Sequence, residues 1–223
     1  AFARLAAERP PGMPTVVMAC TINEEHGYTG ATALAQLWSR GEGIFPRRPD
    51  VAIVAEPTEL QVVAAHKGVV RWCCRAHGRA GHSSQPQEGT NAIFNIAPVL
   101  AALERYHRDI ALAMKPHPLC GTPTLSVGTI AGGLSVNTIP AECTIEIDRR
   151  VIPGEDGWAA IHDVEAFLRE RTTVDFEMLP PWCDGATLAD TINGSWADRL
   201  MKHITAVAGP HEKQGAWYGT NAS

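Results

Sequence analysis

The middle of the chain alternates between strand-like and helix-like stretches in an order that fits only a small set of folds. From residue 60 to residue 179 the order is ββ-α-ββ-α-β. The expected strands are residues 60–65, 69–76, 124–130, 142–150 and 174–179, and the expected helices are residues 91–106 and 156–171. The first two strands should form an antiparallel pair around a turn at Lys67-Gly68. The pattern predicts a compact α+β module of the ferredoxin-like type, in which helices pack on one sheet.

The segment before this module follows a different pattern. Short apolar runs at residues 15–20 and 51–54 are typical of buried strands, and residues 30–39 carry apolar side chains at helical spacing. A strand, a helix and a second strand in this order predict a parallel βαβ unit.

A further helix, expected at residues 195–207, returns to this first style, so we expect two domains. An α/β domain with a mixed, largely parallel sheet and flanking helices would comprise residues 1–62 and 178–223. The α+β module, residues 63–177, would be inserted into it. The chain opens inside an expected helix and stops without closing an element, which predicts that it is an internal piece of a longer protein.

Composition excludes several classes of protein. The 223 residues are 45% hydrophobic and 19% charged, which is ordinary for a globular protein in water. The net charge of -5 and the lack of a basic block argue against a nucleic-acid partner. No apolar stretch approaches the roughly 18 residues of a membrane span, and no signal peptide is visible. Six cysteines without a CxxC pair predict reduced thiols and a cytoplasmic location.

Two adjacent carboxylates, Glu24 and Glu25, follow the first apolar run. The carboxyl end of a buried strand is where open α/β sheets place their active sites. Adjacent acids repel each other unless a cation lies nearby, and a metal ion would bind one acid and leave the other free for proton transfer. The alternative is the acidic start of a solvated helix, where carboxylates suit the helix dipole.

Glu56 follows the second apolar run, and a right-handed crossover would bring it close to the acid pair. Three converging carboxylates favour a metal centre, because zinc accepts carboxylate oxygens. The alternative for Glu56 is a loop acid that precedes Pro57.

Seven motifs occur in one order along nearly the whole chain. They are NEEHG at 23–27, AEPT at 55–58, AHKG at 65–68, GRAGHSS at 78–84, NTIP at 137–140, DRR with PG at 148–154, and YGTNA at 218–222. With these motifs the chain resembles the M20 family of metallo-aminoacylases and peptidases, which includes acetylornithine deacetylase and succinyl-diaminopimelate desuccinylase. The resemblance implies a zinc-hydrolase-type catalytic domain with an inserted lid and dimerisation domain.

The resemblance also implies roles in the metal centre. Glu24 matches the general base, Glu25 a metal ligand, and Glu56 the acidic ligand of a second metal. Two divalent ions are implied, with zinc favoured and cobalt or manganese also suited to such ligands. The family's His-x-Asp motif and bridging Asp lie upstream of these residues and its last His ligand lies downstream. The chain alone is therefore expected to bind metal weakly and to be inactive.

Other matched residues lie in the substrate-binding parts of the family. His82 matches a lid histidine that helps bind the substrate carbonyl, usually in the partner subunit's site, and Asn137 matches a substrate contact. Arg150 matches an arginine that holds the substrate carboxylate. The alternative for His82 is a loop histidine capped by Ser83 and Ser84. The alternative for Arg150 is a surface charge at the end of a strand. Arg149 is expected to be a surface or sheet-edge charge.

For the last motif, the resemblance implies that Gly219 and Thr220 bind the substrate. The family often has Gly-Thr-Asp there, whereas this chain has Asn221. Loss of that carboxylate would weaken a supporting hydrogen bond or the recognition of a substrate amine.

The implied activity is metal-dependent hydrolysis of the amide bond of an N-acyl amino acid, with deacetylase-like or desuccinylase-like specificity. A di- or aminopeptidase of the same family and a non-catalytic, dimerising relative are the alternatives. The expected partners are a small N-acyl amino acid or short peptide and a second copy, bound through the lid domain. The helix at 91–106 is either the dimer contact or the cover of its own sheet.

Overall fold

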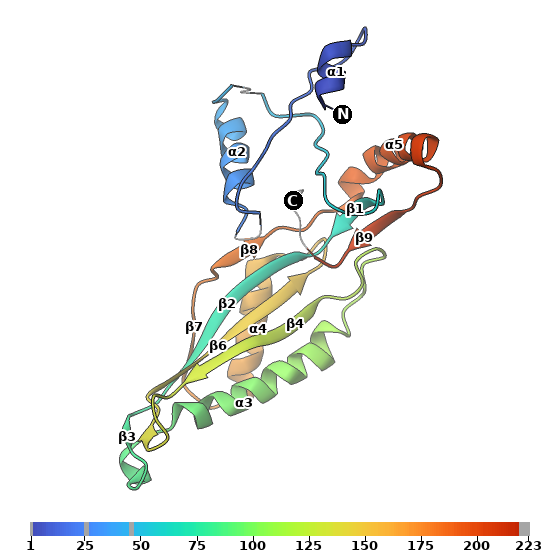
Figure 1. The fold of residues 1–223 in the computed structure, drawn as a ribbon. Coiled ribbons are helices and arrows are strands. Elements are labelled where there is room, and N and C mark those ends of the chain that lie inside the picture. Colours follow the sequence, from blue (N-terminus) through green and yellow to red (C-terminus); the bar gives the residue numbers. More distant parts are fainter. Residues whose placement is uncertain (1, 25–26, 45–46, 219–223) are drawn as a thin grey trace. The chain divides into compact units, whose positions relative to one another are not determined.

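A computed structural model describes residues 2–24, 27–44 and 47–218 (Figure 1). The chain divides into two compact units, residues 1–52 and residues 53–223. Among the described residues, no helix combines the length and the apolar character needed to cross a bilayer.

The first unit contains two helices, α1 (Phe2–Glu8) and α2 (Thr29–Arg40). Both were expected from sequence, and α2 ends at Gly41, whose left-handed backbone (φ 69°) lets its N–H donate to the carbonyls of Leu37 and Trp38. The glycine therefore fixes the end of this helix.

The strands expected at residues 15–20 and 51–54 are wrong for the described chain, and with them the parallel βαβ unit. Neither run pairs with another strand, and Val16, Met18 and Ile53 are exposed. An apolar run becomes a buried strand only where neighbouring strands and a covering layer are present, and the described residues supply neither.

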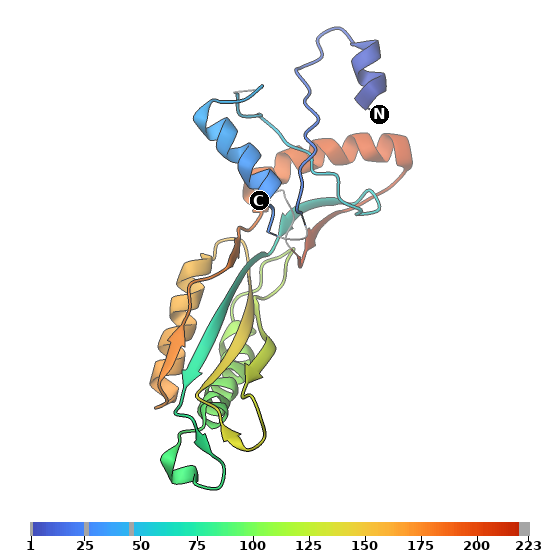
Figure 2. The same ribbon diagram turned by 60° about the vertical axis from the view of Figure 1, so that its left-hand side comes forward.

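The second unit is built on a five-stranded antiparallel sheet with the path β4-β6-β2-β7, where β8 also pairs with β2. Its strands are β2 (Gly68–His77), β4 (Thr124–Gly132), β6 (Glu142–Val151), β7 (Phe176–Met178) and β8 (Cys183–Gly185). Helices α3 (Ala92–Arg105) and α4 (Gly157–Arg171) pack against this sheet, as Figure 2 shows. This arrangement confirms the predicted α+β module.

Both helices begin where the sequence predicts. Asn91 Oδ1 accepts from Ile93 N at 2.9 Å, and Asp156 Oδ1 accepts from Ala159 N at 2.8 Å. These side chains satisfy N–H groups that a helix start leaves without partners.

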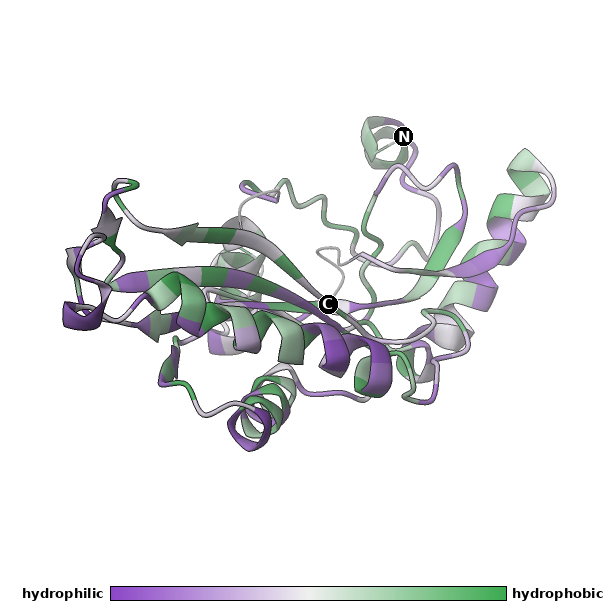
Figure 3. Cartoon of the chain, turned by 90° about the horizontal axis from the view of Figure 1, so that it is seen from below, coloured by the Kyte–Doolittle hydropathy of each residue, from purple (hydrophilic) through white to green (hydrophobic). Residues whose placement is uncertain are grey.

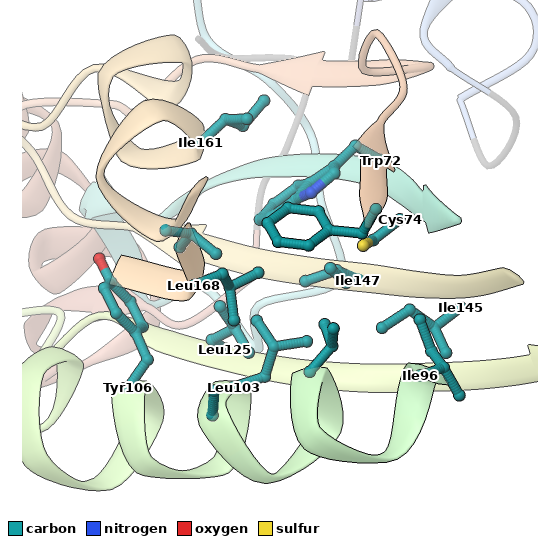
Figure 4. Close-up of a cluster of buried hydrophobic side chains, with 14 of the residues drawn as sticks. Trp72, Cys74, Ile96, Leu103, Tyr106, Leu125, Ile145, Ile147, Ile161 and Leu168 are labelled. Carbon is teal, nitrogen blue, oxygen red and sulfur yellow. The ribbon is translucent and has the colours of Figure 1, made fainter. Parts of the chain in front are cut away.

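One hydrophobic core lies between the sheet and the two helices (Figure 4). Alternate residues of β2 and β6 point into it, among them Trp72, Ile145 and Ile147, while Leu103 and Leu168 enter from the helices. Hydrophobic and polar residues accordingly alternate along these strands (Figure 3). The inward faces of α3 and α4 therefore cover their own sheet, as the alternative for the helix at 91–106 predicts, and Ile96 and Leu103 are buried inside the module.

A smaller parallel sheet pairs β1 (Val62–His66) with β9 (Lys213–Ala216), and α5 (Asp190–Ala208) packs on it. The predicted hairpin between β1 and β2 is therefore wrong. Lys67 donates its backbone N–H to Ala216 O at 3.1 Å, and the chain runs on into β2 without reversing. A Cβ on Gly68 would lie 2.5 Å from Gly185 O, so this glycine permits a close crossing rather than a turn.

Short elements complete the second unit. They are β3 (Gly81–His82), β5 (Thr138–Ile139), a 3-10 helix at Pro86–Glu88 and a π-helix at Tyr106–Ala111 that continues α3. The pair β3–β5 forms a separate small ladder beyond the end of β6, and it matters for the site below.

Trp72 provides a test of the core. Its side chain is 0% exposed, yet its indole N–H has no hydrogen-bond partner among the described residues. Trp72→Phe should therefore lower the free energy of unfolding by less than about 1.5 kcal/mol, because the lost contacts are partly offset by removal of a buried unpaired donor. Urea denaturation measures this, with the half-exposed Trp158→Phe as control. If Trp72→Phe lowers the free energy of unfolding by more than about 3 kcal/mol, the buried indole N–H does have a partner and this interpretation is wrong.

Candidate functional site

Glu24 lies in a turn ahead of α2 and is half-buried. Asn23, in a left-handed conformation (φ 57°), shapes this turn: its Nδ2 donates to Thr29 Oγ1 at 2.9 Å and its carbonyl accepts from Tyr28 N at 2.9 Å. The helix starts only at Thr29 and has no acid in its first turn, so Glu24 does not cap it. The alternative of an acidic helix start does not apply to Glu24.

Glu56 belongs to the second unit and is half-buried before Pro57. Glu25 lies outside the described residues, as do Gly219, Thr220 and Asn221. Within the described ranges, no three His, Cys, Asp or Glu side chains come together in a way that could hold a metal ion. The donor types suit zinc, but these residues alone do not assemble the centre.

His82 and Asn137 are brought together at one end of the α+β module. β3 and β5 pair so that His82 lies opposite Thr138, and Ser83 N donates to Asn137 O at 3.0 Å. His82 Nδ1 accepts from Ser84 N at 3.2 Å and contacts Ser84 Oγ at 2.7 Å. Because a backbone N–H can only donate, neutral His82 carries its proton on Nε2.

The arrangement is compatible with both expectations for His82, a loop histidine held by a serine and a donor to a substrate carbonyl. Ser84 holds the ring as the loop alternative predicts, and the same contact leaves an exposed Nε2–H that can donate to a carbonyl oxygen. Asn137 is exposed beside it, and its Oδ1 accepts from Ser135 Oγ at 2.8 Å. These two residues therefore form a polar corner able to donate to a bound oxygen.

Arg150 lies near the opposite end of β6, between Val69 of β2 and Thr124 of β4. Its side chain is 26% exposed, and its Nε donates to Asp148 Oδ1 at 2.7 Å. Arg150 is thus an anchored cation that solvent can still reach.

Arg149 is not a surface charge as expected, because its side chain is 1% exposed. Arg149 lies on the same buried face of β6 as Ile147 and Val151, two positions away from each, so the two-residue period of a strand places its side chain inside. Its Nη2 donates to Glu155 Oε1 at 2.8 Å, and its Nη1 donates to Arg150 O. The buried ion pair thus fixes the backbone next to Arg150.

His66 and Lys67 lie where β1 passes into β2, and both are buried. His66 Nδ1 donates to Lys67 O at 3.0 Å, which leaves Nε2 as an acceptor without a partner among the described residues. Burial lowers the pKa of His66. Burial also lowers the pKa of Lys67, whose Nζ donates to Thr122 O at 2.6 Å. Their contacts make both residues structural.

His66 should make stability depend on pH. Because its folded pKa lies below 6.5, the unfolded chain binds more protons than the folded chain as pH falls from 6.5, so its contribution to stability is lost in that direction. One proton gives a slope of at most about 1.4 kcal/mol per pH unit. Denaturation at pH 5 and pH 7 should show a smaller difference for His66→Gln than for wild type. The exposed His203→Gln is the control; identical pH dependence in all three proteins would contradict this role.

The cysteines are free, as expected. Burial raises the pKa of Cys74 to about 12 and also raises the pKa of Cys120 and Cys143. These thiols stay protonated near neutral pH and are inert packing groups.

Comparison with known proteins agrees with this arrangement. Residues 64–174 match the M20_dimer family, a peptidase dimerisation domain, over just under half of the chain. A tripeptidase from Staphylococcus aureus superposes with a TM-score of 0.59 at 19% identity, over 90% of this chain and 50% of that one. An aminopeptidase PepT from Bacillus cereus superposes with a TM-score of 0.58 at 17% identity, over 91% of this chain and 50% of that one.

An amidase of the hydantoinase/carbamoylase family from Burkholderia phymatum gives a TM-score of 0.52 at 14% identity, over 73% of this chain and 39% of that one. The chain thus spans half or less of the length of these proteins, and the likeness concerns the fold. It confirms the predicted fold class, a mixed α/β architecture with a lid module. Residues 64–174 are therefore similar to a peptidase dimerisation domain of the M20 type.

Proposed function

We propose that the chain is part of a metal-dependent M20 hydrolase that cleaves the amide bond of an N-acyl amino acid. The observation that carries the proposal is the polar corner of His82 and Asn137, which β3 and β5 bring together from motifs far apart in sequence. The Nε2–H of His82 can donate a hydrogen bond to an oxygen that gains negative charge during attack on an amide. The proposed domains are residues 1–62 with 178–223 for catalysis and residues 63–177 for the lid.

In this proposal Glu24 is the general base. It takes a proton from the attacking water and returns it to the leaving nitrogen. Glu25 and Glu56 would each be a ligand of one of two divalent ions, with zinc favoured over cobalt or manganese, and these ions would polarise the substrate carbonyl. Arg150 would hold the substrate carboxylate, and Gly219 and Thr220 would also bind the substrate.

The positions of His82 and Arg150 favour a site shared by two copies. His82 lies beyond the Glu142 end of β6, and Arg150 lies near its other end. Eight residues of strand between Glu142 and Arg150 span roughly 26 Å, more than a small substrate can bridge. If both residues act on one substrate, they come from different copies of the chain.

A second copy also fits the exposed surface near this corner. β4 is an edge strand of the sheet among the described residues, and edge strands present unpaired backbone groups. Leu134 is 98% exposed and Val136 100% exposed in the loop after it, close in sequence to Asn137. We propose that this edge and loop contact the partner. Analytical ultracentrifugation checks this, and a strict monomer at high micromolar concentration would count against it.

The activity is tested with the full-length protein loaded with zinc, cobalt or manganese. N-acetylornithine, N-succinyl-diaminopimelate and dipeptides are compared by kcat/KM, with chelated enzyme as control. Preference for an N-acyl amino acid supports the proposal. Preference for dipeptides would place the protein among the peptidases, and no turnover with any metal would favour a non-catalytic relative.

A further inference from the structure

Asp148 holds the side chain of Arg150 at two points. Arg150 Nε donates to Asp148 Oδ1 at 2.7 Å, and Arg150 Nη2 donates to Asp148 Oδ2 at 3.1 Å. The two residues are two positions apart on β6 and lie on the same face of the sheet, opposite the buried face that carries Ile147 and Val151. The contact is therefore a bidentate pair along one side of the guanidinium.

This contact leaves the other edge of the guanidinium available. A guanidinium has five N–H groups, and Asp148 takes the Nε–H and one N–H of Nη2. The two N–H groups of Nη1 and the second one of Nη2 face away from Asp148. They form a second fork, at the end of the side chain, that matches the two oxygens of another carboxylate.

Asp148 is itself fixed from the neighbouring strand. Arg71 lies directly opposite Asp148 in the β2–β6 ladder, and Arg71 Nε donates to Asp148 Oδ2 at 2.7 Å. The three side chains are between 26% and 35% exposed, so the charges are only partly screened by water. Asp148 thus lies between two guanidiniums, which hold its carboxylate in place.

We infer that Asp148 is a positioning residue, which presents the end-on fork of Arg150 to the carboxylate of the substrate. The inference rests on the proposed function, because it assumes that Arg150 binds that carboxylate. Without Asp148 the long Arg150 side chain would sample several rotamers, and ordering it on binding would weaken affinity for the substrate. Asp148 does not touch the substrate and supplies no step of the reaction.

The test is Asp148→Asn in the full-length, metal-loaded protein. An amide keeps the size of the side chain but removes its charge and places an NH2 group against the N–H donors of Arg150. KM for the N-acyl amino acid that wild type hydrolyses best should rise by about tenfold or more, with kcat changed less than about twofold. With the same substrate carrying a neutral amide in place of the carboxylate, kcat/KM should be equal in wild type and variant.

The matched control is Glu146→Gln, the next acid along the same face of β6, which should leave both substrates unaffected. Asp148→Glu keeps the charge and serves if the Asn variant does not fold; it should raise KM for the carboxylate substrate alone. Equal losses with both substrates, or no loss with either, would overturn the positioning role. Absence of wild-type turnover would refute the proposed function and this role together, whereas a uniform loss refutes the role alone.

Discussion

Replacing Glu24 by Gln in the full-length protein should lower kcat about 10²–10⁴-fold, because a general base contributes that much and an amide cannot accept the proton. Gln keeps the size of the side chain, so the turn that Asn23 closes before α2 should persist. The measurement is steady-state hydrolysis of the best N-acyl amino acid.

Metal content separates the role of Glu24 from that of its neighbour. Glu24→Gln should retain the full metal stoichiometry, whereas Glu25→Gln should lose metal together with activity. Glu42→Gln, an exposed acid that follows α2, is the control and should leave both properties unchanged. A Glu24→Gln enzyme with more than about a tenth of wild-type kcat would exclude the general-base role.

The second large effect concerns the buried ion pair of Arg149 and Glu155. Arg149→Met should lower the free energy of unfolding by about 3–5 kcal/mol, because it leaves the Glu155 carboxylate buried without its partner. Glu155 Oε2 also accepts from Ile152 N at 2.8 Å, so the carboxylate cannot turn to solvent without losing this bond. Guanidinium denaturation of the single variant measures the loss.

The double variant Arg149→Met/Glu155→Gln isolates the cause. It should recover much of the stability, because no charge is left unpaired and Gln can still accept from Ile152. Arg108→Met breaks an exposed ion pair with Asp109 and should change nothing measurable. If the double variant is as unstable as the single one, packing rather than charge accounts for the loss.

The correct predictions rest on local signals. α3 and α4 lie within the ranges expected from sequence, residues 91–106 and 156–171. The signals that specify them, the caps Asn91 and Asp156 and the apolar spacing, all lie within a few residues of these helices. The antiparallel strands β2 and β6 alternate clearly, because one face is buried and the other is polar.

The failures concern partners that lie far away in the chain. β1 pairs with β9, some 150 residues later, and nothing in residues 60–65 indicates that partner rather than the adjacent β2. The apolar run at 15–20 predicts that these side chains are buried, but it does not indicate which part of the protein would cover them. The pairing of β3 with β5, which joins His82 to Asn137, could not be derived from two-residue strands. Arg149, by contrast, could have been placed from strand alternation.

The passage of the chain from the small parallel sheet into the larger antiparallel sheet has a consequence for how the larger sheet and its helices could be exchanged in evolution and in the laboratory. The chain enters the larger sheet after His66 and leaves it before Leu188, and these two residues exchange both backbone hydrogen bonds, at 3.1 and 3.2 Å. Entry and exit are therefore adjacent, so residues 67–187 form a cassette whose ends already meet. Such a cassette can be lost, gained or grafted into another host as one piece, because closing the gap that it leaves requires no long connection.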